Sequence, residues 1–165
     1  MTDKPAALYF MCGKMGAGKS THARVLAQEH RAVLLVQDAL LEALYPGEIR
    51  TIPDFVKYSA RLREAMAPHI HSLLLRGDPV VLDFPGNTRS QRQWFRELFV
   101  GANVAHELHF VDVPDDICKR QLHQRSAHLP AGSAWTTEAE FDAITAYFQA
   151  PAEDECFNVI RHVRG

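Results

Sequence analysis

Short apolar runs alternate with longer amphipathic segments along the chain. The runs occupy residues 8–12, 33–37, 80–84, 106–113 and 157–160, the fourth being more mixed than the others. A strand whose successive side chains are nearly all apolar is buried on both faces, which is typical of a parallel sheet. The alternation therefore predicts an α/β fold, an open sheet covered by helices on both faces.

The segments between the runs are predicted to be helices that pack against the sheet. They cover residues 19–30, 39–45, 54–76, 90–101, 115–127 and 137–149. Pro68 lies inside the third segment and should kink or split that helix. Two capping boxes are predicted, Ser90 with Gln93 and Thr137 with Glu140, and Gly101 should end the helix that begins at Ser90.

Composition narrows the class of protein. With 165 residues, 47% hydrophobic and 23% charged, the sequence predicts one soluble domain over residues 1–165. A formal net charge of -2 gives no overall basic field for capturing nucleic acid. No apolar stretch approaches the ~20 residues of a membrane-spanning helix. Three scattered cysteines and an N-terminus without a signal-peptide pattern predict reduced thiols in a cytoplasmic protein.

The strongest chemical signal is a glycine-rich loop between the first strand and the first helix. The pattern G-x-x-x-x-G-K-[ST] is matched by Gly13-Lys14-Met15-Gly16-Ala17-Gly18-Lys19-Ser20-Thr21. Glycines allow backbone N–H groups to converge on phosphate oxygens, and the following helix directs the positive end of its dipole at the same anion. Lys19 is expected to contact the β- and γ-phosphates, and the Ser20 hydroxyl to ligate Mg²⁺.

The loop alone does not distinguish a kinase from a GTPase or an ATPase. A GTPase would normally also carry an Asn-Lys-x-Asp motif for guanine, which this sequence lacks. The chain is also too short for a motor protein or an AAA+ ATPase with its appended helical domain. A kinase is therefore the leading prediction.

Aspartates follow two of the predicted strands, Asp38 after the second and Asp83 after the third. Ligands of a parallel α/β sheet bind at the carboxyl ends of the strands. One carboxylate is expected to act as general base for an acceptor hydroxyl, and the other to help hold Mg²⁺. The alternatives are that Asp38 caps the next helix and that Asp83 orders a loop.

Two pairs of arginines are candidate cations for the transferred charge and for the acceptor. Arg120 and Arg125 follow the fourth strand, where a phosphoryl-transfer site needs positive charge. Arg89 and Arg92 follow Asp83 and are expected beside the acceptor pocket. The alternative for these arginines is a solvated helix face.

In this order, these pieces resemble a P-loop kinase of the zeta-toxin-like and chloramphenicol-phosphotransferase-like group of small AAA-domain kinases. More distantly, the chain is similar to shikimate, gluconate and nucleoside monophosphate kinases. The resemblance rests on the glycine-rich loop, the strand end at Asp38, residues 80–92, Arg120 with Arg125, and the tail at residues 151–159. It implies a three-layer α/β/α P-loop NTPase fold, five parallel strands with the first in the middle, ATP and Mg²⁺.

The resemblance also implies roles for single residues. Asp38 matches the catalytic acid of the family, and Arg120 matches the arginine that borders the adenine. Arg125 and the following residues match a lid, expected at about residues 126–150, that closes on the phosphates and excludes water. Residues 157–162 match a segment near the adenine ring.

The sequence thus predicts an ATP-dependent phosphotransferase that acts on a hydroxyl of a small molecule or nucleotide. The predicted catalytic residues are Lys19, Asp38, Arg120 and Arg125. The predicted acceptor-binding residues are Asp38, Asp83, Arg89 and Arg92, and the predicted Mg²⁺ ligands are Ser20 and Asp83. A monomer or homodimer is expected, without nucleic-acid or membrane partners. The alternatives are a non-catalytic ATP-dependent switch that binds a protein, and a toxin-like kinase of nucleotide-sugars.

Overall fold

Five parallel strands form the centre of the structure, a computed structural model that describes residues 5–127 and 137–164. They are β1 (Ala7–Cys12), β2 (Val33–Val36), β3 (Val80–Asp83), β4 (Ala105–Asp112) and β5 (Val159–Val163). Their order in the sheet is β2-β3-β1-β4-β5, and every neighbouring pair is parallel. The predicted α/β P-loop fold with the first strand in the middle is therefore confirmed.

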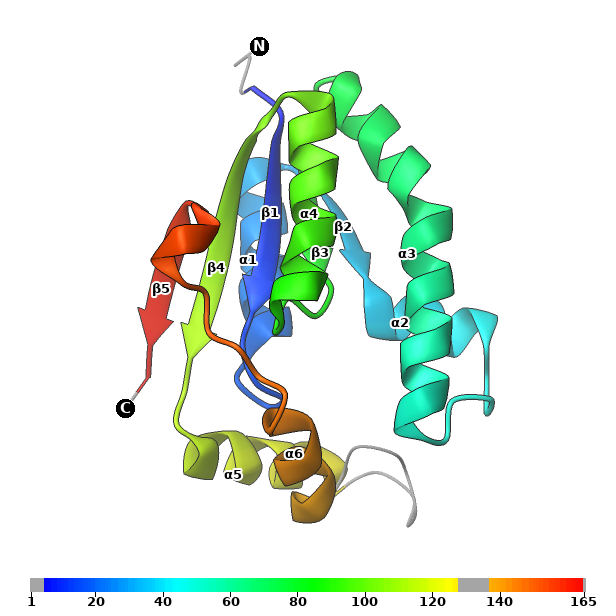
Figure 1. Cartoon of the computed structure of the whole chain (residues 1–165), viewed down its shortest axis with the longest axis vertical. Coiled ribbons are helices and arrows are strands. Elements are labelled where there is room, and N and C mark those ends of the chain that lie inside the picture. Colours follow the sequence, from blue (N-terminus) through cyan, green and yellow to red (C-terminus); the bar gives the residue numbers. More distant parts are fainter. Residues whose placement is uncertain (1–4, 128–136, 165) are drawn as a thin grey trace.

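Helices cover both faces of this sheet (Figure 1). They are α1 (Lys19–His30), α2 (Gln37–Leu44), α3 (Ile52–Leu75), α4 (Arg89–Ala102), α5 (Asp115–Ser126) and α6 (Glu138–Thr145), with a 3₁₀ turn, η1, at Glu153–Glu155. Within the described ranges, no helix is both long enough and apolar enough to cross a membrane. Of the predicted lid at residues 126–150, residues 128–136 lie outside the described residues.

The central strand shows why its sequence is continuously apolar. All of β1 is buried, and its side chains alternate between two cores. Leu8 and Phe10 pack into the core formed with α2, α3 and α4. Tyr9 and Met11 pack into the core formed with α1 and α5 on the opposite face. A strand between two helical layers has no solvent face, so polar alternation is absent.

The boundaries of α4 differ from the prediction. Thr88 is the N-cap, because its hydroxyl oxygen accepts a hydrogen bond from the N–H of Gln91 at 3.1 Å. The capping box predicted at Ser90 and Gln93 was therefore wrong by two residues. The helix also continues past Gly101, and Asn103 ends it in a left-handed conformation with φ of 54°.

Other helix and strand boundaries were partly correct. The capping box of Thr137 is confirmed at the start of α6, but that helix ends at Thr145, earlier than predicted. The last strand begins at Val159, two residues later than predicted. Helix α3 runs through Pro68 without splitting, and Figure 1 shows it curving over its length.

Candidate active site

The loop between β1 and α1 has a backbone that its glycines make possible. Gly16 and Gly18 have φ angles of 76° and 98°, in the left-handed region that side chains disfavour. A Cβ on Gly16 would also collide with the carbonyl oxygen of Cys118 in α5. Gly18 is the N-cap of α1 and, as a glycine, has no side chain that could cap the N–H groups of that first turn. The loop therefore presents a helix N-terminus suited to an anion.

Lys19 lies at the start of α1 with its ammonium turned back onto the loop. It donates a hydrogen bond to the carbonyl oxygen of Gly13. Burial lowers the pKa of Lys19, and the nearby carboxylates of Asp83 and Asp38 act in the opposite direction. A desolvated ammonium gains most from an added negative charge, so phosphate oxygens would stabilise this side chain.

The two predicted aspartates meet at the carboxyl edge of β2 and β3. Val36 at the end of β2 is in register with Asp83 at the end of β3, and Asp38 follows two residues after Val36. Asp38 is the second residue of α2, whose N-cap is Val36, so the alternative N-cap role of Asp38 was wrong. The sheet register therefore explains why both carboxylates lie beside the loop.

The surroundings of Asp38 raise the pKa of its carboxyl. Desolvation raises the pKa of Asp38, and the like charge of Asp83 raises it further. The cations Lys19 and Arg125 oppose that rise. A carboxylate with a raised pKa holds a proton more readily than a free aspartate, which suits a general base.

Ser20 and Asp83 form the arrangement that fits Mg²⁺. The Ser20 hydroxyl donates a hydrogen bond to a carboxylate oxygen of Asp83 at 2.7 Å, beside the glycine-rich loop. Mg²⁺ prefers hard oxygen ligands, keeps several waters and shares phosphate oxygens with its substrate, so two protein oxygens are enough. Across residues 5–127 and 137–164, no cluster of three or more His, Cys, Asp or Glu side chains forms a metal site.

The two arginines of α5 have different surroundings. Arg125 is exposed, and its charge acts on the carboxylate of Asp38. Arg120 is also exposed and lies 3.8 Å from Asp116 in the same helix. The structure therefore brings Arg125 into electrostatic range of Asp38, whereas Arg120 pairs within α5.

The predicted acceptor-binding residues Arg89 and Arg92 both make ion pairs with a later segment of the chain. The side chain of Arg92 is fully buried and donates two hydrogen bonds to the Glu155 carboxylate, at 2.8 and 3.0 Å. It also donates to the carbonyl oxygens of Gly86 and Gln149. Arg89 pairs with Asp154 at 2.8 Å. Both arginines pair with acids of the segment after α6, Arg92 in the buried interior and Arg89 at the surface.

Asn87 is a contact of the loop that the sequence did not reveal. Its side-chain oxygen accepts a hydrogen bond from the N–H of Gly13 at 2.9 Å. Its carbonyl oxygen accepts one from the N–H of Gln149 at 2.8 Å. A single asparagine in a connection carries no local signal for such a role, because both partners are distant in sequence.

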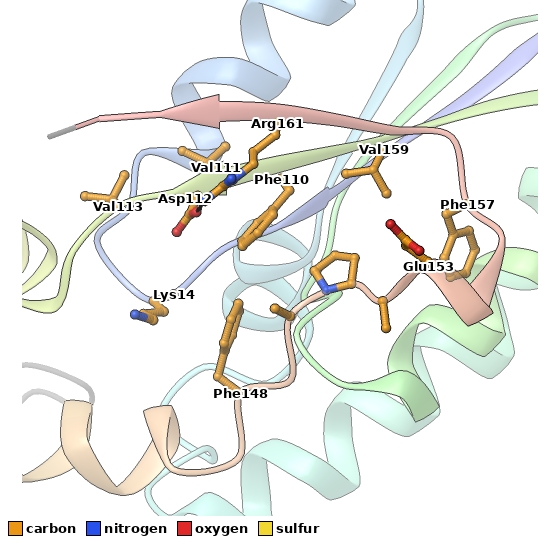
Figure 2. A pocket seen from close by; sticks show the side chains of 13 residues that line it. Lys14, Phe110, Val111, Asp112, Val113, Phe148, Glu153, Phe157, Val159 and Arg161 are labelled. Carbon is orange, nitrogen blue, oxygen red and sulfur yellow. Dashed lines mark hydrogen bonds and ion pairs between the residues drawn. The ribbon is translucent and has the colours of Figure 1, made fainter.

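A cavity of about 620 Å³ lies on the α4 face of β4 and β5, beside the start of the loop. Figure 2 shows Phe110 and Phe148 facing one another across it, with Lys14 at one end and Phe157 at the other. Arg161 pairs with Asp112 along its wall. Of the predicted site residues only Lys14 lines this cavity, so it is separate from the pair of aspartates.

The fold has close counterparts among solved structures. A protein of Chloroflexus aurantiacus, classed provisionally as a kinase, is 16% identical with a TM-score of 0.73, covering 96% of this chain and 88% of that chain. A sugar kinase of Janibacter sp. HTCC2649 is 16% identical with a TM-score of 0.63, covering 96% and 85%. The Mycobacterium tuberculosis APS kinase CysC, in complex with AMPPNP and APS, is 19% identical with a TM-score of 0.60, covering 98% and 91%.

At these identities the likeness concerns the fold. No curated protein matches the chain. The sequence model of one family, described as an AAA domain, matches residues 8–151 and so takes in the glycine-rich loop, both aspartates and α5. The chain therefore belongs to the AAA domain family AAA_33.

Proposed function

We propose that the protein is an ATP-dependent kinase that transfers the γ-phosphoryl group to a hydroxyl of a small molecule or nucleotide. The observation that carries this proposal is the convergence of a phosphate-binding loop and two strand-end carboxylates. Lys19 and the Ser20–Asp83 pair lie at the loop, and Asp38 lies one strand further along the sheet. In this arrangement the donor phosphates would bind at the loop, and the acceptor hydroxyl would bind beside Asp38.

The donor side rests on the loop and α1. Backbone N–H groups and Lys19 would bind the β- and γ-phosphates and stabilise the charge that moves between them. Ser20 and Asp83 would hold Mg²⁺, which when bound neutralises phosphate charge. The oxygen ligands and their position beside the loop support this assignment.

The acceptor side rests on Asp38. Its raised pKa favours taking a proton from a hydroxyl as that oxygen approaches the γ-phosphorus. Arg125 is proposed to stabilise the transferred group, since its charge already acts on Asp38. Arg120 is proposed to contact the nucleotide from α5. Arg89 and Arg92 are left out of the proposed site because their partners are internal.

The structural counterparts support a small-molecule acceptor. One of them is a sugar kinase, and another binds AMPPNP together with APS. Family membership supports the same class of reaction without indicating which compound is phosphorylated.

The test is ADP release from ATP and Mg²⁺, measured with and without a panel of hydroxyl compounds. We expect at least one compound to accelerate ADP release and to become phosphorylated, and Lys19→Ala to abolish this. Asp38→Asn should abolish transfer while AMPPNP still binds, because Asp38 is placed on the acceptor side. Full turnover by Asp38→Asn with unchanged AMPPNP binding would show that the base is another residue.

A further inference from the structure

Arg63 is a half-buried cation that has no counterion among the described residues. Among residues 5–127 and 137–164 its guanidinium makes no ion pair or hydrogen bond with another side chain. Burial lowers the pKa of Arg63, and no carboxylate opposes that effect. Partly buried arginines ordinarily pair with an acid, because their desolvation is otherwise uncompensated. The missing partner needs an explanation.

Helix periodicity places Arg63 on the side of α3 that is turned toward α4. Side chains four residues apart form a ridge along a helix, and Ser59, Arg63, Ala67 and His71 form such a ridge on α3. Ser59 is buried, Ala67 packs against the core, and His71 lies against Gly101 of α4. In Figure 1 both helices run away from the edge of the sheet where the strands end. Arg63 therefore lies two turns nearer to that edge than the His71 contact.

A second unsatisfied group lies on the same ridge. Gln37 is fully buried beside Asp38, and its amide nitrogen donates to the Ser59 hydroxyl at 3.3 Å. Its amide oxygen has no hydrogen-bond partner in the part of the chain that the structure describes. Reversing the amide would leave the nitrogen unpaired instead, so one polar atom is unsatisfied in either orientation. Arg63 thus lies one turn from Ser59 on the same ridge, and Ser59 is bonded to Gln37, the residue before the proposed base.

We propose that the phosphoryl acceptor carries an anionic group, a carboxylate or a phosphate, that binds Arg63 between α3 and α4. This inference rests on the proposed function and specifies its substrate class. Guanidinium binds either anion through two parallel hydrogen bonds. Asp38 and Asp83 repel an anion, so the anionic group lies at the Arg63 end and the hydroxyl at the Asp38 end. Gln37 supplies a neutral hydrogen bond between them.

The experiment measures binding of three matched sets of compounds to the protein loaded with AMPPNP and Mg²⁺, by calorimetry. The sets are neutral sugars and sugar alcohols, sugar acids, and sugar phosphates with nucleoside monophosphates. We expect one anionic set to bind, and Arg63→Gln to weaken that binding about 10- to 100-fold. Arg63→Lys should restore part of the affinity. Arg61→Gln is the matched control, because Arg61 is exposed and lies over the ring of Tyr58.

The two anionic sets distinguish a carboxylate from a phosphate. The proposal is overturned if the neutral set alone binds, if no anionic compound binds, or if Arg63→Gln binds the anionic set as the wild type does. With ATP in place of AMPPNP, the same compounds test the proposed function separately. A compound that binds through Arg63 but never becomes phosphorylated would refute the kinase reaction and leave the anion site standing.

Discussion

The substitution Glu155→Gln tests whether Arg92 is a structural residue rather than an acceptor-binding one. The Arg92 and Glu155 side chains are 0% and 7% exposed, and two hydrogen bonds join them. The substitution keeps the shape of residue 155 but removes its charge, which leaves a buried guanidinium without an anion. Losing one member of a buried pair costs about 3–5 kcal/mol, and the amide oxygen retained by glutamine places the expected loss near 3 kcal/mol.

A loss of that size is a large part of the 5–15 kcal/mol that is typical for the total stability of a domain. For a chain of this length it corresponds to a fall of about 6–12 °C in Tm. Urea unfolding followed by circular dichroism measures the change, and an unaltered slope shows that the folded state is intact. The control is Asp154→Asn, whose partner Arg89 is exposed, so its midpoint should equal that of the wild type.

The pH dependence gives a second check on the same pair. Burial by itself raises the pKa of Glu155, but hydrogen bonds from Arg92 and from the N–H of Ala152 outweigh it, so the pKa is lowered. A carboxyl with a lowered pKa stabilises the fold above its unfolded-state pKa, and this contribution is lost as pH falls through the folded-state value. The deficit of Glu155→Gln should therefore be full at neutral pH and vanish in acid. A midpoint no lower than that of Asp154→Asn at neutral pH would refute the structural role.

Two further predictions concern the proposed site. Asp38→Asn should raise the Tm of the ligand-free protein at neutral pH while abolishing transfer. Because the pKa of Asp38 is raised in the folded state, the wild type loses stability as pH rises through that folded-state pKa. Scanning fluorimetry should therefore show the gain in Tm of Asp38→Asn shrinking toward pH 4. An equal gain in Tm at every pH would contradict this. Ser20→Ala should weaken AMPPNP binding about 10-fold in Mg²⁺ and little in EDTA, as measured by calorimetry, because only the metal ligand is lost. Equal weakening in both buffers would place Ser20 on the phosphate instead.

The part of the site that could be predicted from the sequence lies in contiguous residues or at strand ends. The glycine-rich loop is one such case, because the geometry of phosphate binding fixes residue types at consecutive positions. The positions of Asp38 and Asp83 are another, since carboxyl ends of parallel strands share one edge of the sheet. The order of the strands could not be derived from the runs themselves and came from the family resemblance.

The sequence did not predict the buried ion pair of Arg92, and the reason is physical. Its partner lies 63 residues away, so no local pattern reveals the ion pair. One signal was present, since positions 92, 95 and 99 share a helix face and the other two are buried phenylalanines. An arginine on an apolar stripe is a candidate for a buried pair. The wrong N-cap predicted for α4 has a different cause. Thr88 with Gln91 and Ser90 with Gln93 have the same spacing, so the sequence does not distinguish them, and only the backbone conformation before the helix does.

The hydrogen bonds of Gly13 show how the fold orders the beginning of the loop. Its N–H donates to Asn87 and its carbonyl oxygen accepts from Lys19, so both backbone groups are satisfied without a ligand. Asn87 in turn is bound to Gln149, whose carbonyl oxygen accepts from the buried Arg92. The beginning of the loop is thus fixed by the same network that anchors the segment after α6. Because that end is already ordered, a phosphate group meets α1 with less conformational entropy to lose. If the loop binds a nucleotide as proposed, the ion pair of Arg92 and Glu155 would contribute through the geometry of the loop, without touching the nucleotide.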